Sequence, residues 1–83
     1  MMKFYSEKIR EIREKELEQA YDIARKYLND TSDENRLELE EFAEKHGIEV
    51  EFEKYRVFLR NAYFSAIAFS EDFWEHIFDS FSE

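Results

Sequence analysis

The chain is almost free of residues that interrupt a helix: it has no proline, and Gly47 is its only glycine. Proline and glycine are the strongest local breaks in regular secondary structure, so their scarcity favours long helices and leaves a hairpin without its usual turn residues. A chain of 83 residues can bury one hydrophobic core but hardly a second. The sequence therefore predicts an all-α fold, a compact bundle of about four helices that forms a single domain over residues 1–83.

Hydrophobic periodicity places the first helix at about residues 6–29. Between Ile9 and Leu28, apolar side chains recur every three to five residues and trace one side of a helix. Opposite charges four residues apart are expected to pair on the exposed side of this helix. These pairs are Arg10–Glu14, Glu11–Lys15 and Asp22–Lys26.

The second helix is predicted at about residues 32–46. Thr31 and Glu34 have the spacing of a capping box at its start. Gly47 is expected to end it, with Ile48 making the apolar contact of a Schellman motif. The side chains expected to be buried are Leu37, Leu39, Phe42 and Ala43.

The segment after Gly47 has two interpretations. Ile48, Val50 and Phe52 alternate with glutamates, which is a strand pattern, whereas the apolar spacing from Phe52 onward is helical. Because no turn residues follow, we predict helices at about residues 52–68 and 70–81, with Ser70 as the N-cap of the last one. The alternative is an α+β fold with a short strand or hairpin at about residues 48–60.

The net charge is concentrated in the second part of the chain. Residues 1–31 are neutral overall, whereas residues 32–83 carry all nine net negative charges and eleven aromatic side chains lie between Phe42 and Phe81. This charge opposes binding to nucleic acid or an anionic membrane and favours a protein partner with a basic surface. No segment is long enough to span a bilayer. With no cysteine and no leading apolar segment, we expect a cytoplasmic protein, in the host cytoplasm if it is viral.

Two rows of carboxylates are the candidate partner-binding residues. Within each row the residues are three or four positions apart, so they share one face of the second or the last predicted helix. Such a row would imitate a phosphate backbone and fit a basic groove; an ordinary solvated acidic surface is the alternative interpretation. The residues are Glu34, Glu38, Glu41, Asp72, Glu75, Asp79 and Glu83.

The aromatic side chains predict self-association. The expected helix over residues 52–68 is apolar nearly all round, and three short neighbours cannot cover it completely. Exposed aromatic side chains commonly anchor protein interfaces. We therefore expect a homo-oligomer, most simply a twofold dimer, with Phe58, Phe64 and Trp74 as anchors.

The sequence predicts no catalytic residue, no cofactor and no metal site. Its histidines fall in no metal-binding helix motif, and one glycine cannot build a phosphate-binding loop. Asp72, His76 and Asp79 share a helix face that suits a divalent cation, but acidic helices often produce this spacing, so a solvated face is the favoured interpretation. His46 is expected to stabilise the C-terminus of the second helix.

Small, acidic, cysteine-free helical proteins of this kind resemble phage-encoded inhibitors of host defence or host polymerases, among them nucleic-acid mimics and anti-CRISPR proteins. The resemblance rests on size and charge and involves no motif. It implies a non-enzymatic inhibitor or adaptor that acts on a larger basic protein, a class that includes proteins that bind nucleic acid. The alternative function is a structural subunit that assembles with copies of itself and has no foreign target.

Overall fold

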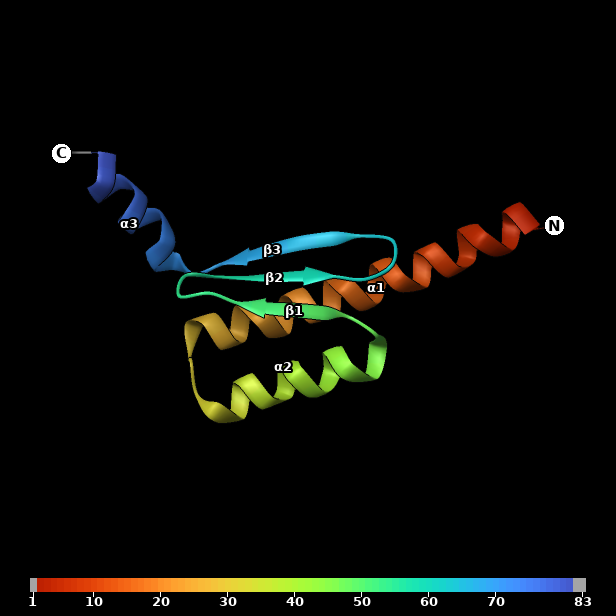
Figure 1. Ribbon diagram of the computed structural model, residues 1–83, viewed down its shortest axis with the longest axis horizontal. Coiled ribbons are helices and arrows are strands. Elements are labelled where there is room, and N and C mark those ends of the chain that lie inside the picture. Colours follow the sequence, from red (N-terminus) through yellow and green to blue (C-terminus); the bar gives the residue numbers. More distant parts are fainter. Residues whose placement is uncertain (1, 82–83) are drawn as a thin grey trace.

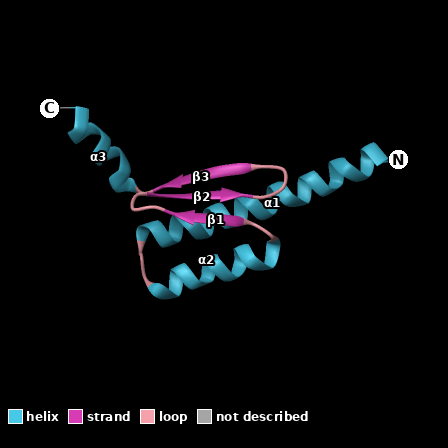
Figure 2. Cartoon of the chain, in the orientation of Figure 1, coloured by secondary structure: helices cyan, strands magenta, loops and turns pink. Residues whose placement is uncertain are grey.

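The computed structural model describes the backbone of residues 2–81 and the side chains of residues 7–75 and of Ile77. Two long helices are followed by a three-stranded sheet and a shorter helix (Figure 1; Figure 2). The fold is therefore a small α+β fold, and the predicted all-α bundle is wrong. The elements are α1 (Met2–Asn29), α2 (Asp33–His46), β1 (Glu49–Phe52), β2 (Arg56–Arg60), β3 (Ser65–Phe69) and α3 (Glu71–Phe81).

The link between α1 and α2 is held by local hydrogen bonds. The Ser32 hydroxyl accepts a hydrogen bond from the Asn35 backbone N–H at 3.2 Å, which makes Ser32 the N-cap of α2. The buried Asn35 amide donates to the Asp30 carbonyl at 2.8 Å. The predicted capping box, with Thr31 as its first residue, is therefore one position too early.

The end of α2 is as predicted. Gly47 has φ 64° and ψ 38°, the left-handed conformation that glycine adopts without a steric cost. The Ile48 N–H donates to the Ala43 carbonyl at 2.8 Å, and the Gly47 N–H donates to the Glu44 carbonyl at 3.5 Å. This is a Schellman motif, and Ile48 is buried beside it.

The strands form an antiparallel sheet in the order β1-β2-β3. The register aligns Val57 of β2 with Phe52 of β1 and Ala68 of β3. These three aligned side chains are buried or half-buried. So are the next three aligned side chains on the same face of the sheet, two residues away along each strand. This face packs on the two long helices, and α1 passes behind the sheet in Figure 1. The buried apolar residues are Leu17, Ala20, Ala24, Leu39, Ala43, Ile48, Val57, Leu59 and Ala68.

Small side chains let α1 approach the sheet closely. Ala20 and Ala24 on α1 and Ala68 on β3 are all fully buried. α1 lies under β2 and β3, whereas α2 packs next to β1. One face of the sheet is therefore covered, and the opposite face is left open.

The predicted helix over residues 52–68 is wrong: two turns interrupt the segment and divide it into strands. In the first turn the Glu53 N–H donates to the Arg56 carbonyl at 2.9 Å. In the second turn the Asn61 side-chain oxygen accepts hydrogen bonds from the N–H groups of Tyr63 and Phe64 at 2.9 and 2.8 Å. Neither turn needs glycine or proline. The α+β alternative named the correct class, but it did not include β3.

α3 continues from the end of β3 and projects from the sheet, as Figure 1 shows. Its start at Glu71 lies one residue after the predicted boundary. The rings of Phe69 and Trp74 lie 6.0 Å apart between centroids, the contact of a hydrophobic staple at a helix start. The N-terminal turns of α1 also extend beyond the sheet, at the opposite end of the molecule (Figure 1).

Candidate protein-binding surfaces

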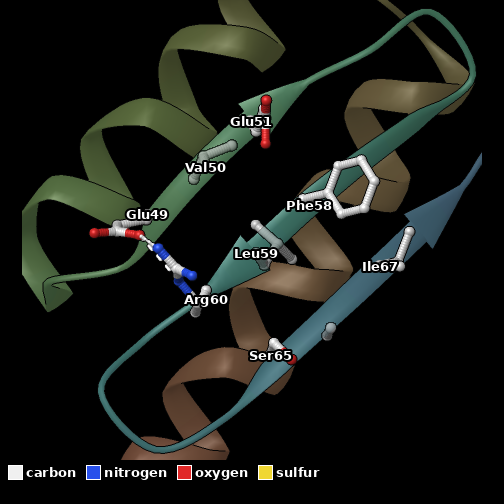
Figure 3. Close-up of a pocket in the computed structure, with 9 residues that line it drawn as sticks. Glu49, Val50, Glu51, Phe58, Leu59, Arg60, Ser65 and Ile67 are labelled. Atoms are coloured by element: carbon white, nitrogen blue, oxygen red, sulfur yellow. Dashed lines mark hydrogen bonds and ion pairs between the residues drawn. The ribbon is translucent and has the colours of Figure 1, made fainter.

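The face of the sheet turned away from the helices has an apolar centre with charged neighbours (Figure 3). In the register, Phe58 lies between Glu51 and Ile67, and Ile67 is 38% exposed. Arg60 donates from Nε to Glu49 at 3.0 Å, and this hydrogen bond raises the pKa of Arg60 above its ordinary value. We call this surface the open sheet face. Its residues are Glu49, Glu51, Arg56, Phe58, Arg60, Ser65, Ile67 and Phe69.

An aromatic cluster connects the open sheet face with α3. The ring centroids of Phe69 and Phe73 are 4.5 Å apart, and those of Phe73 and Trp74 are 5.4 Å apart in an edge-to-face arrangement. Trp74 nevertheless remains 55% exposed. The largest aromatic side chain of the protein is therefore held in place by its neighbours and still presented to solvent.

The predicted anchor residues do not form one patch. Phe58 lies on the open sheet face and Trp74 lies on α3. Phe64 is half-buried in the turn before β3, where the Arg10 guanidinium lies 5.7 Å from its ring centroid. Because residues 52–68 form strands and turns rather than one helix, Phe64 is separated from Phe58.

The two predicted carboxylate rows are also separate. Glu34, Glu38 and Glu41 are exposed on α2, which lies next to β1. Asp72 and Glu75 are exposed on α3, which follows β3 at the other edge of the sheet (Figure 1). The side chain of Asp79 and the whole of Glu83 lie outside the described residues. The structure therefore does not combine the rows into one acidic surface.

A third row of carboxylates, not anticipated from the sequence, lies on α1. Glu14, Glu18 and Asp22 are exposed and border a groove between α1 and the start of β3. We call these residues the rim carboxylates. Their spacing of four residues was visible in the sequence. However, residues 1–31 have equal numbers of positive and negative charges, which suggested that the charged side chains of α1 pair with one another.

The expected ion pairs on α1 are absent from the described side chains. None of Arg10–Glu14, Glu11–Lys15 or Asp22–Lys26 lies within 4.0 Å. Lys26 instead pairs with Glu38 of α2 at 3.0 Å. The rim carboxylates therefore remain available to an incoming cation.

The groove follows the free edge of β3. Leu17, Tyr21, Phe64 and Ala66 supply its apolar walls. A second hollow, lined among others by Tyr21, Phe69 and Trp74, continues it towards α3. We call the two hollows together the edge groove.

The histidines show no catalytic arrangement among the described side chains. His46 lies at the end of α2, with Nδ1 3.4 Å from a Glu16 oxygen and its ring 4.3 Å from that of Phe42. Glu16 also accepts a hydrogen bond from Arg13 at 2.8 Å. Within the described part of the chain, no group of three potential metal-ligating side chains is close enough to hold an ion. The side chains of His76 and Asp79 lie outside the described residues.

No protein-family model, curated protein or solved structure matches this chain significantly. Among the residues that the structure describes, no helix is both long and apolar enough to cross a bilayer.

Proposed function

We propose that this chain is a non-enzymatic protein-binding module that acts as an inhibitor or adaptor on a larger protein with a basic surface. The observation that carries the proposal is the uncovered apolar surface that runs from β3 to α3. Ile67 and Trp74 are 38% and 55% exposed, and the rings of Phe69 and Phe73 connect them. Contiguous exposed apolar surface is typical of interaction sites, and buried aromatics contribute much of the binding energy of protein interfaces.

The charge around this surface supports a basic partner. Glu71, Asp72 and Glu75 are exposed on α3 directly beside the aromatic cluster, in a chain of net charge −9. Such charges repel nucleic acid and acidic proteins and accelerate encounter with a basic surface. A protein that binds nucleic acid presents a surface of this kind. The absence of cysteine supports a cytoplasmic location for the complex.

Capture of binding proteins at two salt concentrations tests the proposal. The tagged chain is incubated with lysate of its source or host at about 0.1 M and about 1 M salt, where the screening length falls from about 10 Å to about 3 Å. The test variant carries Asp72→Lys and Glu75→Lys. A matched control carries Glu7→Lys and Glu11→Lys, which change the net charge equally on the exposed N-terminal part of α1.

The expected result is capture of a basic protein by the wild type and by the control at low salt. Capture should be much weaker with the test variant at low salt, and much weaker with every form of the chain at high salt. Trp74→Ala is expected to weaken capture at both salt concentrations, because it removes an aromatic anchor rather than a charge. Capture of the same proteins by all variants at both salt concentrations would contradict the proposal.

A second candidate is a self-assembling subunit, and one observation favours it. On the open sheet face, Glu49 and Glu51 lie along β1, and Arg56 and Arg60 lie along β2. Two copies that pack face to face around Phe58 could therefore set the glutamates of one copy against the arginines of the other. Sedimentation of the free chain over a range of concentrations tests this arrangement. A dimer that Phe58→Asp dissociates would support self-assembly, and a monomer at every concentration would exclude it.

A further inference from the structure

β3 is an edge strand that carries none of the usual protection against pairing. Within the described residues it pairs only with β2, and its sequence Ser-Ala-Ile-Ala-Phe has no charge and no proline. Natural proteins usually protect an exposed edge with charged residues, proline or a covering element. The opposite edge strand, β1, carries Glu49 and Glu51 and packs beside α2. The bare edge of β3 is therefore suited to accept another strand.

The hydrogen-bond pattern shows which backbone groups of β3 face outward. The Asn61 N–H donates to the Phe64 carbonyl at 2.9 Å, and the Ser70 N–H donates to the Tyr55 carbonyl at 2.8 Å. Hydrogen-bonded pairs alternate along an antiparallel ladder, so Ala66 and Ala68 bond to β2. The intervening residues, Ser65, Ile67 and Phe69, direct their N–H and C=O groups to the free edge.

The edge groove indicates what kind of side chains the added strand carries. Side chains of a strand alternate between two faces, so one set would enter the edge groove and the other would extend the open sheet face. The groove combines apolar walls, including Leu17 and Tyr21, with the rim carboxylates. Lysine and arginine fit such a site, because their aliphatic stems pack on apolar surface while their charged ends reach carboxylates. The other set would lie beside Ile67 and Phe69, which favours apolar residues.

A second copy of this chain fits the same edge poorly. Twofold pairing of β3 with itself would bring two α1 helices together and set Glu14, Glu18 and Asp22 against their own copies. No pairing cation lies within 4.0 Å of these carboxylates in the described structure. Like charges at close range are unfavourable, whereas a basic segment would neutralise them.

We infer that the free edge of β3 and the edge groove bind an extended segment of the partner by strand addition, and that basic and apolar residues alternate in this segment. Main-chain hydrogen bonds to Ser65, Ile67 and Phe69 would supply affinity, and the rim carboxylates would supply specificity for lysine or arginine. This inference rests on the proposed function, because it takes the basic partner from that proposal and states which surface of the chain binds it.

A direct binding measurement with the full chain tests the inference. The probe is a fluorescently labelled eight-residue peptide that alternates lysine with valine, and its anisotropy is measured as the chain is added. One control peptide alternates glutamate with valine. A second has the side chains of the probe but methylated backbone nitrogens, so that it keeps its charge and cannot donate hydrogen bonds to β3.

Matched protein variants separate the edge groove from general acidity. The triple variant Glu14→Gln, Glu18→Gln, Asp22→Asn removes the rim carboxylates. The control Asp33→Asn, Glu40→Gln, Glu44→Gln removes as many exposed charges from α2. Ile67→Pro removes the central outward N–H without breaking a bond to β2, and Ile67→Thr retains it. Circular dichroism confirms that each variant is folded, and the methylated peptide tests strand addition without any change to the protein.

The expected result is that the wild-type chain binds the lysine–valine probe and neither control peptide. The affinity for the probe should fall about tenfold or more in the rim variant and in Ile67→Pro, and should not change in their control variants. Equal binding to the rim and α2 variants, or undiminished binding of the methylated peptide, would overturn the inference. A wild-type dimer that Ile67→Pro dissociates would also overturn it, because the edge would then be covered by a second copy. If the probe does not bind while basic proteins are still captured from lysate, the edge groove is excluded and the proposed function stands; if neither binds, both fail.

Discussion

The side-chain amide of Asn61 donates a hydrogen bond to the backbone carbonyl of Arg13, 3.1 Å away and 48 residues earlier in the chain. The same side chain accepts hydrogen bonds from the N–H groups of Tyr63 and Phe64. Asn61 thus shapes the turn between β2 and β3 and fixes this turn to α1. A single asparagine does here what glycine and proline usually do in a hairpin, and it sets the position of the edge groove.

Asn61→Ala is expected to lower the free energy of unfolding by about 2–3 kcal/mol, since it removes three hydrogen bonds worth about 1 kcal/mol each. Asn61→Ser retains a short hydroxyl acceptor for the turn and loses the donor to Arg13, so its cost should be smaller. Urea denaturation followed by circular dichroism measures both variants. Equal losses would mean that the contact with α1, rather than the turn, dominates the effect of Asn61.

Leu37 and Leu39 are a matched pair for testing the packing of α2. Both were expected to be buried, but Leu37 is 54% exposed whereas Leu39 is fully buried. Leu39→Ala should reduce the free energy of unfolding by about 2–5 kcal/mol, and Leu37→Ala should change it by less than about 0.5 kcal/mol. Urea midpoints compare them directly, and a larger effect at Leu37 would mean that α2 is rotated about its axis relative to this structure.

Gly47→Ala should destabilise the protein by about 1–2 kcal/mol, because alanine is strained at a φ of 64°. No atom lies within 4 Å of a Cβ added at this position, so the cost arises from the backbone rather than from a clash. Gly47→Asn should cost less, since asparagine tolerates the left-handed conformation better. Thermal unfolding measures the order glycine, asparagine, alanine, and any other order is incompatible with the Schellman motif.

Ser70→Ala is expected to leave stability unchanged or to raise it slightly. Ser70 is buried just before α3, and its hydroxyl has no hydrogen-bond partner among the described residues. Removing a buried polar group without a partner removes its desolvation cost. Urea denaturation measures the free energy of unfolding of this variant. If the Ser70 hydroxyl instead capped α3, as predicted from the sequence, the substitution would lower that free energy by about 1 kcal/mol.

The candidate surfaces were only partly predictable. The rows on α2 and α3 follow from helical spacing alone, and their described members are indeed exposed. The rim carboxylates were not predictable in this way, because their significance depends on the neighbouring β3, most of which falls within the expected helix over residues 52–68. The edge groove combines residues of α1 with Phe64 and Ala66, which lie more than forty positions later.

The sequence by itself determined α1, α2 and α3, because each element has a 3.6-residue apolar periodicity or a cap formed by its immediate neighbours. Gly47 and Ile48 ended α2 through hydrogen bonds that reach only five residues back. The strands were decided by tertiary structure. The apolar residues of the segment 52–68 fit either a helix or strands. The choice between the two depends on burial of Val57, Leu59 and Ala68 against α1 and on the contact of Asn61 with Arg13. Such long-range packing stabilises one of two locally acceptable conformations, and the alternation from Ile48 to Phe52 could not decide between them by itself.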